Sequence, residues 1–325
     1  MAKILVTGGS GFLGQMLIKH LLAQPQWPDG DDKMGPIDEI IALDQAPGAL
    51  SDARLRYVSA DVSDSAQLQS IVSNDVSGII HLAAVVSGTA ENDFDLGMRV
   101  NLDGTRALLE AARKLPKAPR FLFSSSLAIY GGTLPEIVDD STIPAPQSSY
   151  GTQKLIGEWL VADYTRKGFV NGRCVRIPTV SVRPGKPNGA ASSFASGIIR
   201  EPMAGVRATC PVDPDTALWL ASPEQVVPAL AHAYMLSSAQ LGNQRSINLP
   251  GLTVTPREMA ETLRQLAGDH VADLIDWQID PKIKTIVDTW PARFDTSRAQ
   301  SLGFAPTGTG AELVAAYVRK AAAAT

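Results

Sequence analysis

A tyrosine and a lysine four residues apart, preceded by three consecutive serines, are the side chains of this sequence best suited to move a proton. Tyr150 and Lys154 would share one face of a helix, and Ser124–Ser126 come earlier in the chain. A free tyrosine has a pKa of about 10 and is a poor base unless a nearby positive charge stabilises its phenolate. The Lys154 ammonium supplies such a charge, and a serine hydroxyl can hold the reacting oxygen. The three groups therefore predict proton abstraction from a hydroxyl group, although this tyrosine–lysine spacing alone is more often a surface pair.

A glycine-rich turn near the N-terminus gives this pair its context. The run Thr7–Gly14 follows a short apolar stretch and leads into Phe12–Leu22, where apolar residues recur at helical spacing. Its glycines are Gly8, Gly11 and Gly14. Backbone N–H groups at a helix N-terminus attract a diphosphate, and glycine leaves no Cβ in its way. A glycine turn can also be purely structural, but the strand before it and the helix after it favour dinucleotide binding.

Asp44 closes the second predicted strand and discriminates between the two nicotinamide dinucleotides. A carboxylate at this place accepts hydrogen bonds from both hydroxyls of the adenosine ribose and repels a 2′-phosphate. Gln45–Pro47 supply no cation for such a phosphate, so the sequence favours NAD over NADP. Asp44 lies 30 positions beyond Gly14, farther than usual, and the insertion Gln24–Asp38 accounts for the excess. The alternative is a carboxylate that merely ends a strand.

Two further segments that follow predicted strands are expected to contact the cofactor. They are Asp61 with Val62, beside the adenine, and the small-residue stretch Leu82, Ala83 and Ala84. Lys154 has donors left for the nicotinamide ribose. His81 has no carboxylate neighbour in the sequence, and we interpret it as a hydrogen-bonded structural residue rather than a catalyst.

The elements that must position these side chains indicate an α/β fold. Short apolar strands alternate with longer amphipathic segments, the pattern of a parallel sheet covered by helices on both faces. The strands are expected at Ile4–Thr7, Ile40–Leu43, Arg56–Ser59, Gly78–Leu82, Arg120–Ser124 and Arg173–Ile177. The longest helices are expected at Phe94–Leu115 and Tyr150–Lys167, and Gln24–Asp38 reads as a surface insertion.

We therefore predict a Rossmann-type, doubly wound parallel sheet in residues 1–180, followed by a smaller C-terminal part in residues 181–325. That part is expected to form mainly a substrate-binding lid, with some segments returning to the first domain. Its helices are expected at Ser193–Met203, Pro223–Leu236, Pro256–Ala267 and Ala311–Ala322. The closing run Ala321–Ala324 is expected to be a fraying helix end.

Composition limits the possible partners. Of 325 residues, 45% are hydrophobic and 19% are charged, as in ordinary soluble domains. The net charge of -4 disfavours nucleic acid or an anionic membrane as a partner. Two cysteines and four scattered histidines give neither a disulfide framework nor the spacing of a metal site. With no signal peptide and no apolar run of membrane-spanning length, a cytoplasmic location is expected.

The chain resembles the extended short-chain dehydrogenases/reductases, which include NAD-dependent epimerases and dehydratases. The resemblance rests on Thr7–Gly14, Val100–Thr105, Phe123–Gly131 and Tyr150–Lys154. It implies a Rossmann fold, hydride transfer to or from NAD, and a catalytic set of Ser126, Tyr150 and Lys154. It also implies that Asn101 supports a proton relay through bound water.

The resemblance assigns further residues and an assembly. Ser126 is chosen by matching Ile129–Gly131 to the family's V-Y-G, with Ser125 as the alternative, and Tyr130 is assigned to packing. The implied cofactor contacts are Gly8, Gly11, Phe12, Leu13, Gly14, Asp44, Asp61, Val62, Leu82, Ala83, Ala84, Asn101, Ser124, Tyr150, Lys154, Pro178 and Val180. The two longest predicted helices usually pair across a dyad in this superfamily, so a homodimer is expected.

Members of this superfamily differ in their chemistry. Dehydratases of nucleotide sugars carry an Asp-Glu pair after the catalytic hydroxyl residue, but Leu127 and Ala128 stand at those positions. Nucleotide-sugar epimerases commonly have an asparagine near the exit of the sixth strand, where this chain has Thr179. A dehydratase is therefore disfavoured, and an epimerase stays an alternative. A protein that only senses NAD is disfavoured because Tyr150 and Lys154 are both present.

The segments Ser124–Gly132, Ser148–Gly157 and, above all, Arg183–Glu201 resemble the D-erythronate dehydrogenases. That family oxidises a four-carbon sugar acid at its 2-hydroxyl to the 2-oxo acid, which implies a small polyhydroxy carboxylate as substrate. An arginine can hold a carboxylate through two parallel hydrogen bonds, although a solvated loop would carry the same charges. The expected substrate contacts are Ser87, Ser125, Ser126, Tyr150, Thr179, Arg183, Lys186, Asn188 and Ser192.

Overall fold

The computed structural model describes residues 2–322, which form two compact units. The first unit consists of the described residues up to Ser126, Ser149–Arg176 and Val227–Ile247. The second consists of Leu127–Ser148, Ile177–Val226 and the described residues from Asn248 onward. No helix among the described residues is both long and apolar enough to cross a membrane.

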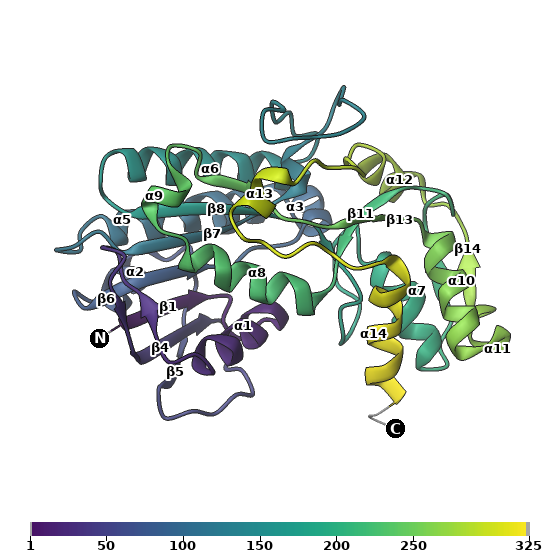
Figure 1. The fold of residues 1–325 in the computed structure, drawn as a ribbon, viewed down its shortest axis with the longest axis horizontal. Coiled ribbons are helices and arrows are strands. Elements are labelled where there is room, and N and C mark those ends of the chain that lie inside the picture. Colours follow the sequence, from purple (N-terminus) through teal and green to yellow (C-terminus); the bar gives the residue numbers. More distant parts are fainter. Residues whose placement is uncertain (1, 323–325) are drawn as a thin grey trace. The chain divides into compact units, whose positions relative to one another are not determined.

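The first unit is built on a seven-stranded sheet in the order β12-β8-β7-β6-β1-β4-β5 (Figure 1). Its strands are β1 (Ala2–Thr7), β4 (Ile37–Asp44), β5 (Leu55–Ser59), β6 (Val76–His81), β7 (Arg120–Ser126), β8 (Asn171–Ile177) and β12 (Ser246–Asn248). The pairs from β5 through β7 are all parallel. The order reverses beside β1, and in such sheets ligands bind at that point, beyond the carboxyl ends of the strands. The predicted doubly wound sheet is confirmed, and most strands begin one to three residues earlier than expected.

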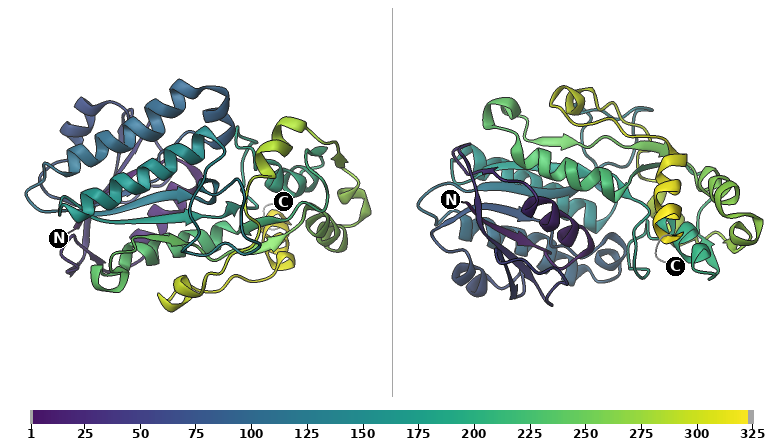
Figure 2. Two further views of the ribbon diagram at one scale, coloured as in Figure 1. Left: turned by 90° about the horizontal axis from the view of Figure 1, so that it is seen from above. Right: turned by 60° about the horizontal axis from the view of Figure 1, so that its bottom comes forward.

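Helices cover both faces of this sheet (Figure 2). On one face lie α2 (Ser65–Ile71), α5 (Gly104–Ala112) and α6 (Ser149–Arg166), and on the other lie α1 (Phe12–Leu22) and α8 (Pro223–Met235). Leu5, Ile41 and Phe121 of the strands are buried in one cluster with Leu108 and Val161 of the helices. This apolar packing holds the carboxyl ends of the strands and the start of α6 in fixed positions. The shorter helices of this unit are α3 (Ser87–Asn92), α4 (Phe94–Gly97) and α9 (Ser238–Leu241).

The helix predicted over Phe94–Leu115 is wrong as a continuous α-helix. After α4, residues Met98–Asp103 form a π-helical segment, η1, and only then does α5 begin. Apolar spacing does not register the one extra residue per turn that a π-helix contains. Asn101 lies in η1 with its side chain buried. Such π-helical segments frequently occur at functional sites.

The surface insertion predicted over Gln24–Asp38 is also wrong in part. It contains the hairpin of β2 (Trp27–Pro28) and β3 (Met34–Gly35), and it includes the first two residues of β4. The Trp27 side chain is 2% exposed, and its indole N–H donates to the Leu21 carbonyl at 3.0 Å. The many turn-forming residues of this segment predict a loop, but they do not predict whether an aromatic side chain within it is buried. The burial of Trp27 was therefore not predicted.

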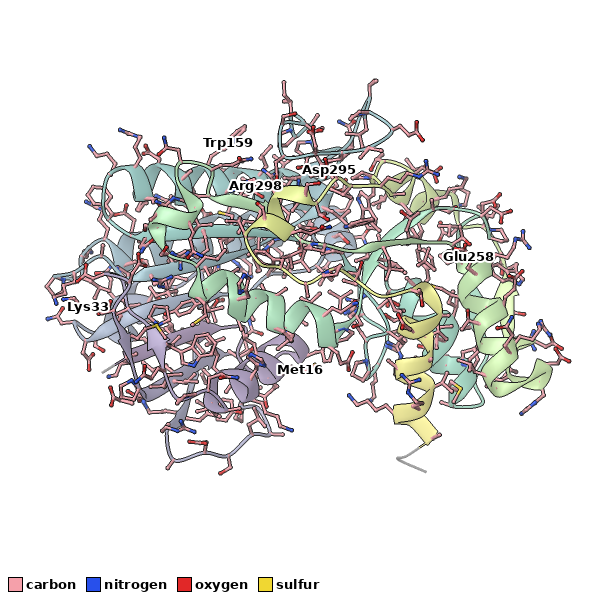
Figure 3. All side chains as sticks on the ribbon, viewed as in Figure 1. Met16, Lys33, Trp159, Glu258, Asp295 and Arg298 are labelled. Carbon is pink, nitrogen blue, oxygen red and sulfur yellow. The ribbon has the colours of Figure 1, made fainter. Side chains whose placement is uncertain are left out.

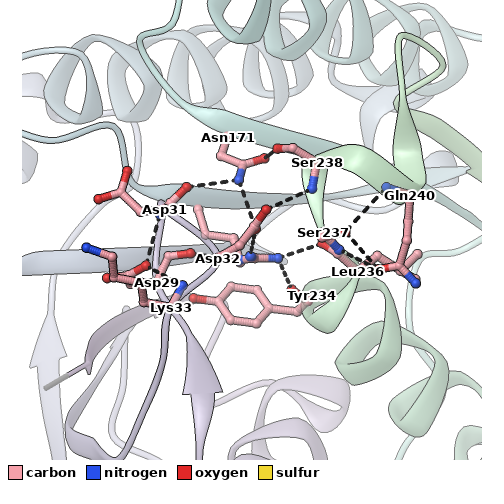
Figure 4. A network of polar contacts seen from close by, with 12 residues as sticks. Asp29, Asp31, Asp32, Lys33, Asn171, Tyr234, Leu236, Ser237, Ser238 and Gln240 are labelled. Carbon is pink, nitrogen blue, oxygen red and sulfur yellow. Dashed lines mark hydrogen bonds and ion pairs between the residues drawn. The ribbon is translucent and has the colours of Figure 1, made fainter.

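A buried arginine explains why the insertion folds back onto the sheet. Arg120 is 0% exposed, and its guanidinium pairs with the Asp32 carboxylate of the insertion. Asp32 also accepts the backbone N–H of Ser238 at 3.1 Å (Figure 4). A buried guanidinium is costly unless it is paired and hydrogen-bonded. Arg120 begins β7, and Ser124–Ser126 end it. The insertion therefore supplies the counterion for an arginine at the start of the strand that carries the serines.

The second unit contains two small sheets and several helices. Its strands are β9 (Thr179–Val180), β10 (Ala208–Cys210), β11 (Leu218–Ala221), β13 (Leu252–Val254) and β14 (Ile275–Trp277). Its helices are η2 (Leu127–Ile129), α7 (Phe194–Met203), α10 (Pro256–Ala267), α11 (Asp269–Ala272), α12 (Pro281–Val287), α13 (Ser297–Ser301) and α14 (Gly310–Ala322). Ile198, Leu220, Met259 and Leu313 share its core. The helices predicted after residue 190 are confirmed to within one residue at each end, and the last two residues of the Ala321–Ala324 run lie outside the described residues.

Candidate active site

The glycine turn joins β1 to α1 at the point where the strand order reverses. Gly8 has φ +69, and a Cβ there would lie 2.8 Å from the backbone nitrogen of Ala83. A Cβ on Gly14 would lie 2.1 Å from the carbonyl oxygen of Gly8. Gly11 is the N-cap residue that precedes α1, and it makes no side-chain hydrogen bond to the first N–H groups of that helix. Glycines that keep side chains out of a helix N-terminus fit a bound diphosphate.

Asp44 is fixed at the carboxyl end of β4, beside this turn. Its Oδ2 accepts the backbone N–H of Ser10 at 3.1 Å, and its Oδ1 accepts that of Gln45 at 2.8 Å. A carboxylate has about four acceptor positions, so two ribose hydroxyls can be accommodated as well. These contacts fit the adenosine half of NAD.

Asp61 and Val62 follow β5 and are engaged within the turn. Asp61 Oδ1 accepts the N–H and the hydroxyl of Ser63 at 2.8 and 2.7 Å, and these hydrogen bonds hold the pKa of Asp61 below its usual value. Val62 is buried and packs against Gly104 at the start of α5. Contact of these residues with adenine stays a prediction.

Replacing Asp44 by asparagine tests this end of the site. Asp44→Asn removes the negative charge but keeps an oxygen for Ser10, so we expect the Kd of NAD to rise about tenfold and the preference over NADP to shrink. Calorimetric titration of both dinucleotides measures the two values. The matched control is Asp38→Asn, an exposed carboxylate near the other end of the same strand, which should change neither. Unchanged NAD affinity in Asp44→Asn would place the adenosine elsewhere.

Tyr150 and Lys154 lie on the first two turns of α6, beside the end of β7. Lys154 is 2% exposed, and its Nζ donates to the carbonyl oxygen of Ser124 at 2.8 Å. The same Nζ lies 5.7 Å from the centre of the Tyr150 ring and 4.8 Å from that of Phe123. The helix approaches the strand this closely because Gly157 faces the Phe123 ring, where a Cβ would lie 2.6 Å from a ring carbon. The structure thus brings the predicted base and its cation together.

Burial has the largest effect on the pKa of the Lys154 ammonium. Desolvation lowers the pKa of its ammonium to about 7, and the nearby Glu158 carboxylate opposes that shift. A phenolate on Tyr150 would also stabilise the ammonium, since opposite charges nearby favour each other's ionised forms. The Lys154 ammonium therefore titrates in the neutral range.

The three serines of β7 are not equivalent. Ser124 donates its hydroxyl to the His81 carbonyl at 2.9 Å, and Ser125 donates its hydroxyl to Glu158 at 2.5 Å. Both side chains are buried, whereas Ser126 is partly exposed at the last position of the strand. The geometry therefore favours Ser126 over Ser125 as the serine that meets a substrate. Glu158 was missed from the sequence, although its position four residues after Lys154 was an available signal.

A buried polar chain links the glycine turn to η1. The Thr7 hydroxyl is 2.6 Å from His81 Nδ1, and His81 Nε2 is 3.0 Å from the Thr105 hydroxyl, which donates to the Asn101 carbonyl. Burial lowers the pKa of His81 to about 3, so the ring is neutral at physiological pH. The expectation that His81 is hydrogen-bonded is confirmed.

Asn101 is held in place by backbone and side-chain partners. Its Oδ1 accepts the Val85 N–H at 2.9 Å, and its Nδ2 donates to the Val85 carbonyl at 3.1 Å and to Gln153 Oε1 at 2.8 Å. Gln153 immediately precedes Lys154 and was not singled out from the sequence. Asn101 therefore fixes the start of α6 against η1, and its place in a proton relay stays a prediction. Ser87, expected to bind substrate, begins α3 and is largely buried.

The remaining predicted residues belong to the second unit. Thr179 and Val180 form β9, directly after Pro178. Ser196 and Arg200 of α7 bind both backbone groups of Arg183: the Ser196 hydroxyl accepts its N–H at 3.0 Å, and Arg200 donates to its carbonyl at 2.9 Å.

Within the loop that follows Arg183, Lys186 and Asn188 are exposed, and Asn188 accepts the Ala190 N–H at 3.1 Å. Ser192 is half-buried just before α7. Tyr130 is fully buried and donates its hydroxyl to Asn248 at 3.0 Å, as its assignment to packing requires. The part of the chain that the structure describes holds no group of three or more side chains suited to a metal ion.

Known proteins are similar to this chain in sequence and in fold. Residues 4–212 match the NAD dependent epimerase/dehydratase family. A D-erythronate dehydrogenase from Cupriavidus necator is 53% identical over 320 residues, 98% of each chain. A D-erythronate dehydrogenase from Haemophilus influenzae is 46% identical over 306 residues, 93% of this chain and 94% of that protein.

Among solved structures, a nucleoside-diphosphate-sugar epimerase from Agrobacterium tumefaciens superposes with a TM-score of 0.88 at 37% identity. The match covers 100% of this chain and 95% of that one. Together, the family match and the two relatives confirm NAD as the cofactor and an oxidoreductase as the class of enzyme. The chain belongs to the NAD-dependent epimerase/dehydratase family of extended short-chain dehydrogenases/reductases.

Proposed function

We propose that this enzyme oxidises the 2-hydroxyl of a small sugar acid to a 2-oxo acid, with D-erythronate as the substrate and 2-dehydro-D-erythronate as the product. The observation that carries the proposal is the buried Lys154 ammonium beside the Tyr150 ring, next to the serine at the end of β7. The glycine turn and Asp44 belong to the same unit. Two relatives of nearly full length are named for this reaction, at 53% and 46% identity.

The chain's own residues divide the work of the reaction. Ser126 holds the reacting hydroxyl oxygen, and the Tyr150 phenolate accepts its proton. Lys154 stabilises that phenolate and offers a donor to the nicotinamide ribose. Bound NAD supplies the acceptor for the hydrogen and two electrons that leave C2 of the substrate. The Gly8–Gly14 turn would hold the diphosphate, and Asp44 would hold the adenosine ribose.

The substrate carboxylate is assigned to Arg183 in the second unit, which we propose as the mainly substrate-binding part. Its backbone is fixed at both ends by α7, so its guanidinium starts from a defined position. An arginine so placed can make two parallel charge-assisted hydrogen bonds to a carboxylate. Lys186, in the exposed loop that follows, is the second cation available.

Arg183→Ala should raise the KM for the sugar acid ten- to a hundredfold, because a charge-assisted bidentate contact is worth about 1.5 to 3 kcal/mol. The Kd of NAD should stay within about threefold, since Arg183 is assigned to the substrate alone. Steady-state kinetics and cofactor titration separate the two effects. The control, Arg207→Ala, removes an exposed arginine of the same unit and should change neither value. An unchanged KM in Arg183→Ala, with a raised KM in Lys186→Ala, would move the clamp to the lysine.

A nucleotide-sugar epimerase is the second candidate, because a structure at 37% identity is named as one. The two reactions differ in their use of the cofactor. A dehydrogenase accumulates NADH with its sugar acid, whereas an epimerase interconverts two sugar nucleotides without net NADH. Incubation with NAD and either D-erythronate or a pair of UDP-sugar epimers discriminates between them.

We also propose a homodimer in the cytoplasm. Trp159 on α6 is 62% exposed and points away from the sheet (Figure 3), and Phe94 on α4 is also exposed. Large aromatic side chains exposed on two neighbouring helices favour an interface between copies of the chain.

A further inference from the structure

A buried carboxylate lies one helical turn beyond Lys154 on α6. Glu158 follows Lys154 at the spacing at which Lys154 follows Tyr150, so the three residues share one face of the helix. The Glu158 side chain is 2% exposed, whereas Trp159 beside it lies on the outer face of α6. The reaction described above assigns no role to this carboxylate.

Both oxygens of Glu158 are fully engaged. Arg176 of β8 donates from Nε to Oε1 at 3.0 Å and from Nη2 to Oε2 at 2.8 Å. The hydroxyl of Ser125 donates to Oε1 at 2.5 Å, and that of Ser246 donates to Oε2 at 2.8 Å. Removing two charges from water costs about as much as their attraction returns. Stability alone is therefore a weak reason to place an ion pair at this position.

The first consequence of the pair is mechanical. Ser125 lies in β7 between Ser124, whose carbonyl binds Lys154, and Ser126, which is assigned to the substrate. Side chains of successive residues in a strand point to opposite faces of the sheet. Anchoring the Ser125 hydroxyl to Glu158 therefore fixes the rotation of the strand end and, with it, the direction of Ser126.

The second consequence is electrostatic, and it depends on which groups near Lys154 carry charge. The titratable groups around it are Tyr150 and Glu158 on α6, His81 on β6, and Cys174 and Arg176 on β8. Burial lowers the pKa of His81 to about 3 and raises the pKa of the Cys174 thiol well above its usual value, so both are neutral near pH 7. β7 contributes the Phe123 ring and the Ser124 carbonyl.

Glu158 and Arg176 thus form an ion pair beside Lys154, with Glu158 acting directly on the lysine. The carboxylate raises the pKa of the Lys154 ammonium against the effect of burial. If Glu158 were neutral, Arg176 would stand unpaired and would lower that pKa instead. If Arg176 were neutral, the uncompensated carboxylate would raise it.

We propose that Glu158, paired with Arg176, is a positioning residue of the active site: it sets the charge of Lys154 and holds the serine strand in its working orientation. The inference rests on the proposed function only in that Lys154 assists the proton transfer. Its charge effect is a property of the protein itself and can be measured without cofactor or substrate.

Two neutralising variants must move the titration of Lys154 in opposite directions. We expect Glu158→Gln to lower its midpoint by about one pH unit and Arg176→Gln to raise it by about one unit. The readout is heteronuclear NMR of the Lys154 side chain in the cofactor-free enzyme, assigned with Lys154→Met. In the active enzyme, the alkaline limb of the kcat profile should move the same way, because turnover needs a charged Lys154 beside the phenolate.

The controls separate positioning from a structural role. Asp163→Asn removes an exposed carboxylate from the same helix and should leave the titration unchanged. The double variant Glu158→Gln with Arg176→Gln removes both charges and should return the midpoint toward the wild-type value. If Glu158→Gln fails to fold, the direction in which Arg176→Gln moves the Lys154 titration tests the inference by itself. Titrations that do not move, or that move in one direction in both single variants, overturn the inference even if the wild-type enzyme oxidises D-erythronate.

Discussion

Tyr150→Phe should lower kcat by about a hundred- to ten-thousandfold, while the Kd of NAD stays within about threefold. The substitution removes only a hydroxyl from a half-buried ring on the first turn of α6. General acid–base groups contribute about a hundred- to ten-thousandfold to turnover, and the Lys154 ammonium beside this ring would stabilise a phenolate that phenylalanine cannot form. Rapid-mixing kinetics and cofactor titration measure the two quantities.

Tyr130→Phe is the matched control for this prediction. Tyr130 is a fully buried tyrosine whose hydroxyl binds Asn248, so its loss should cost about 1 kcal/mol of unfolding free energy and leave turnover nearly intact. Denaturant unfolding and the same kinetic assay check it. Full activity in Tyr150→Phe, or its loss only in Tyr130→Phe, would show that the base has been assigned to the wrong ring.

Gly14→Ala should weaken NAD binding by at least about a hundredfold. The added Cβ would lie 2.1 Å from the carbonyl oxygen of Gly8, a backbone atom that cannot move without opening the turn. Overpacking of this kind typically costs about 1 to 3 kcal/mol of unfolding free energy, and the displaced turn no longer presents its N–H groups to a diphosphate. Cofactor titration and thermal unfolding measure both effects.

Gly197→Ala provides the comparison for that substitution. Gly197 lies within α7, where the nearest side-chain atom to an added Cβ would be the flexible end of Glu201, at 3.4 Å. Alanine is the better helix former, so this variant should bind NAD normally and unfold at the same temperature or slightly higher. Normal NAD affinity in Gly14→Ala would mean that the diphosphate does not lie on the glycine turn.

Most of the fold and of the candidate site was predicted from two features of the sequence: the spacing of apolar residues and the polar residues that follow predicted strands. The central parallel strands are short and largely apolar because both faces of the sheet are covered there, and such strands stand out between amphipathic helices. Asp44, Tyr150 and Lys154 follow strands or begin helices, so their placement could be reasoned from the order of elements. The roles given to individual residues stay predictions.

The features that the sequence did not reveal depend on contacts between distant segments. The insertion is anchored by the ion pair between Arg120 and Asp32. The residues next to each of them in the sequence do not predict this pair. The π-helical segment around Asn101 adds a single residue to an otherwise regular amphipathic pattern. Glu158 shows its importance only when Arg176, Ser125 and Ser246 converge on it from two strands.

The central claim is tested most directly by incubating the purified enzyme with NAD and D-erythronate and following NADH absorbance together with the organic product. The account predicts one NADH for each 2-oxo acid formed, with turnover lost in Tyr150→Phe. It would be contradicted if no sugar acid gave NADH while a pair of UDP-sugar epimers interconverted at constant NAD.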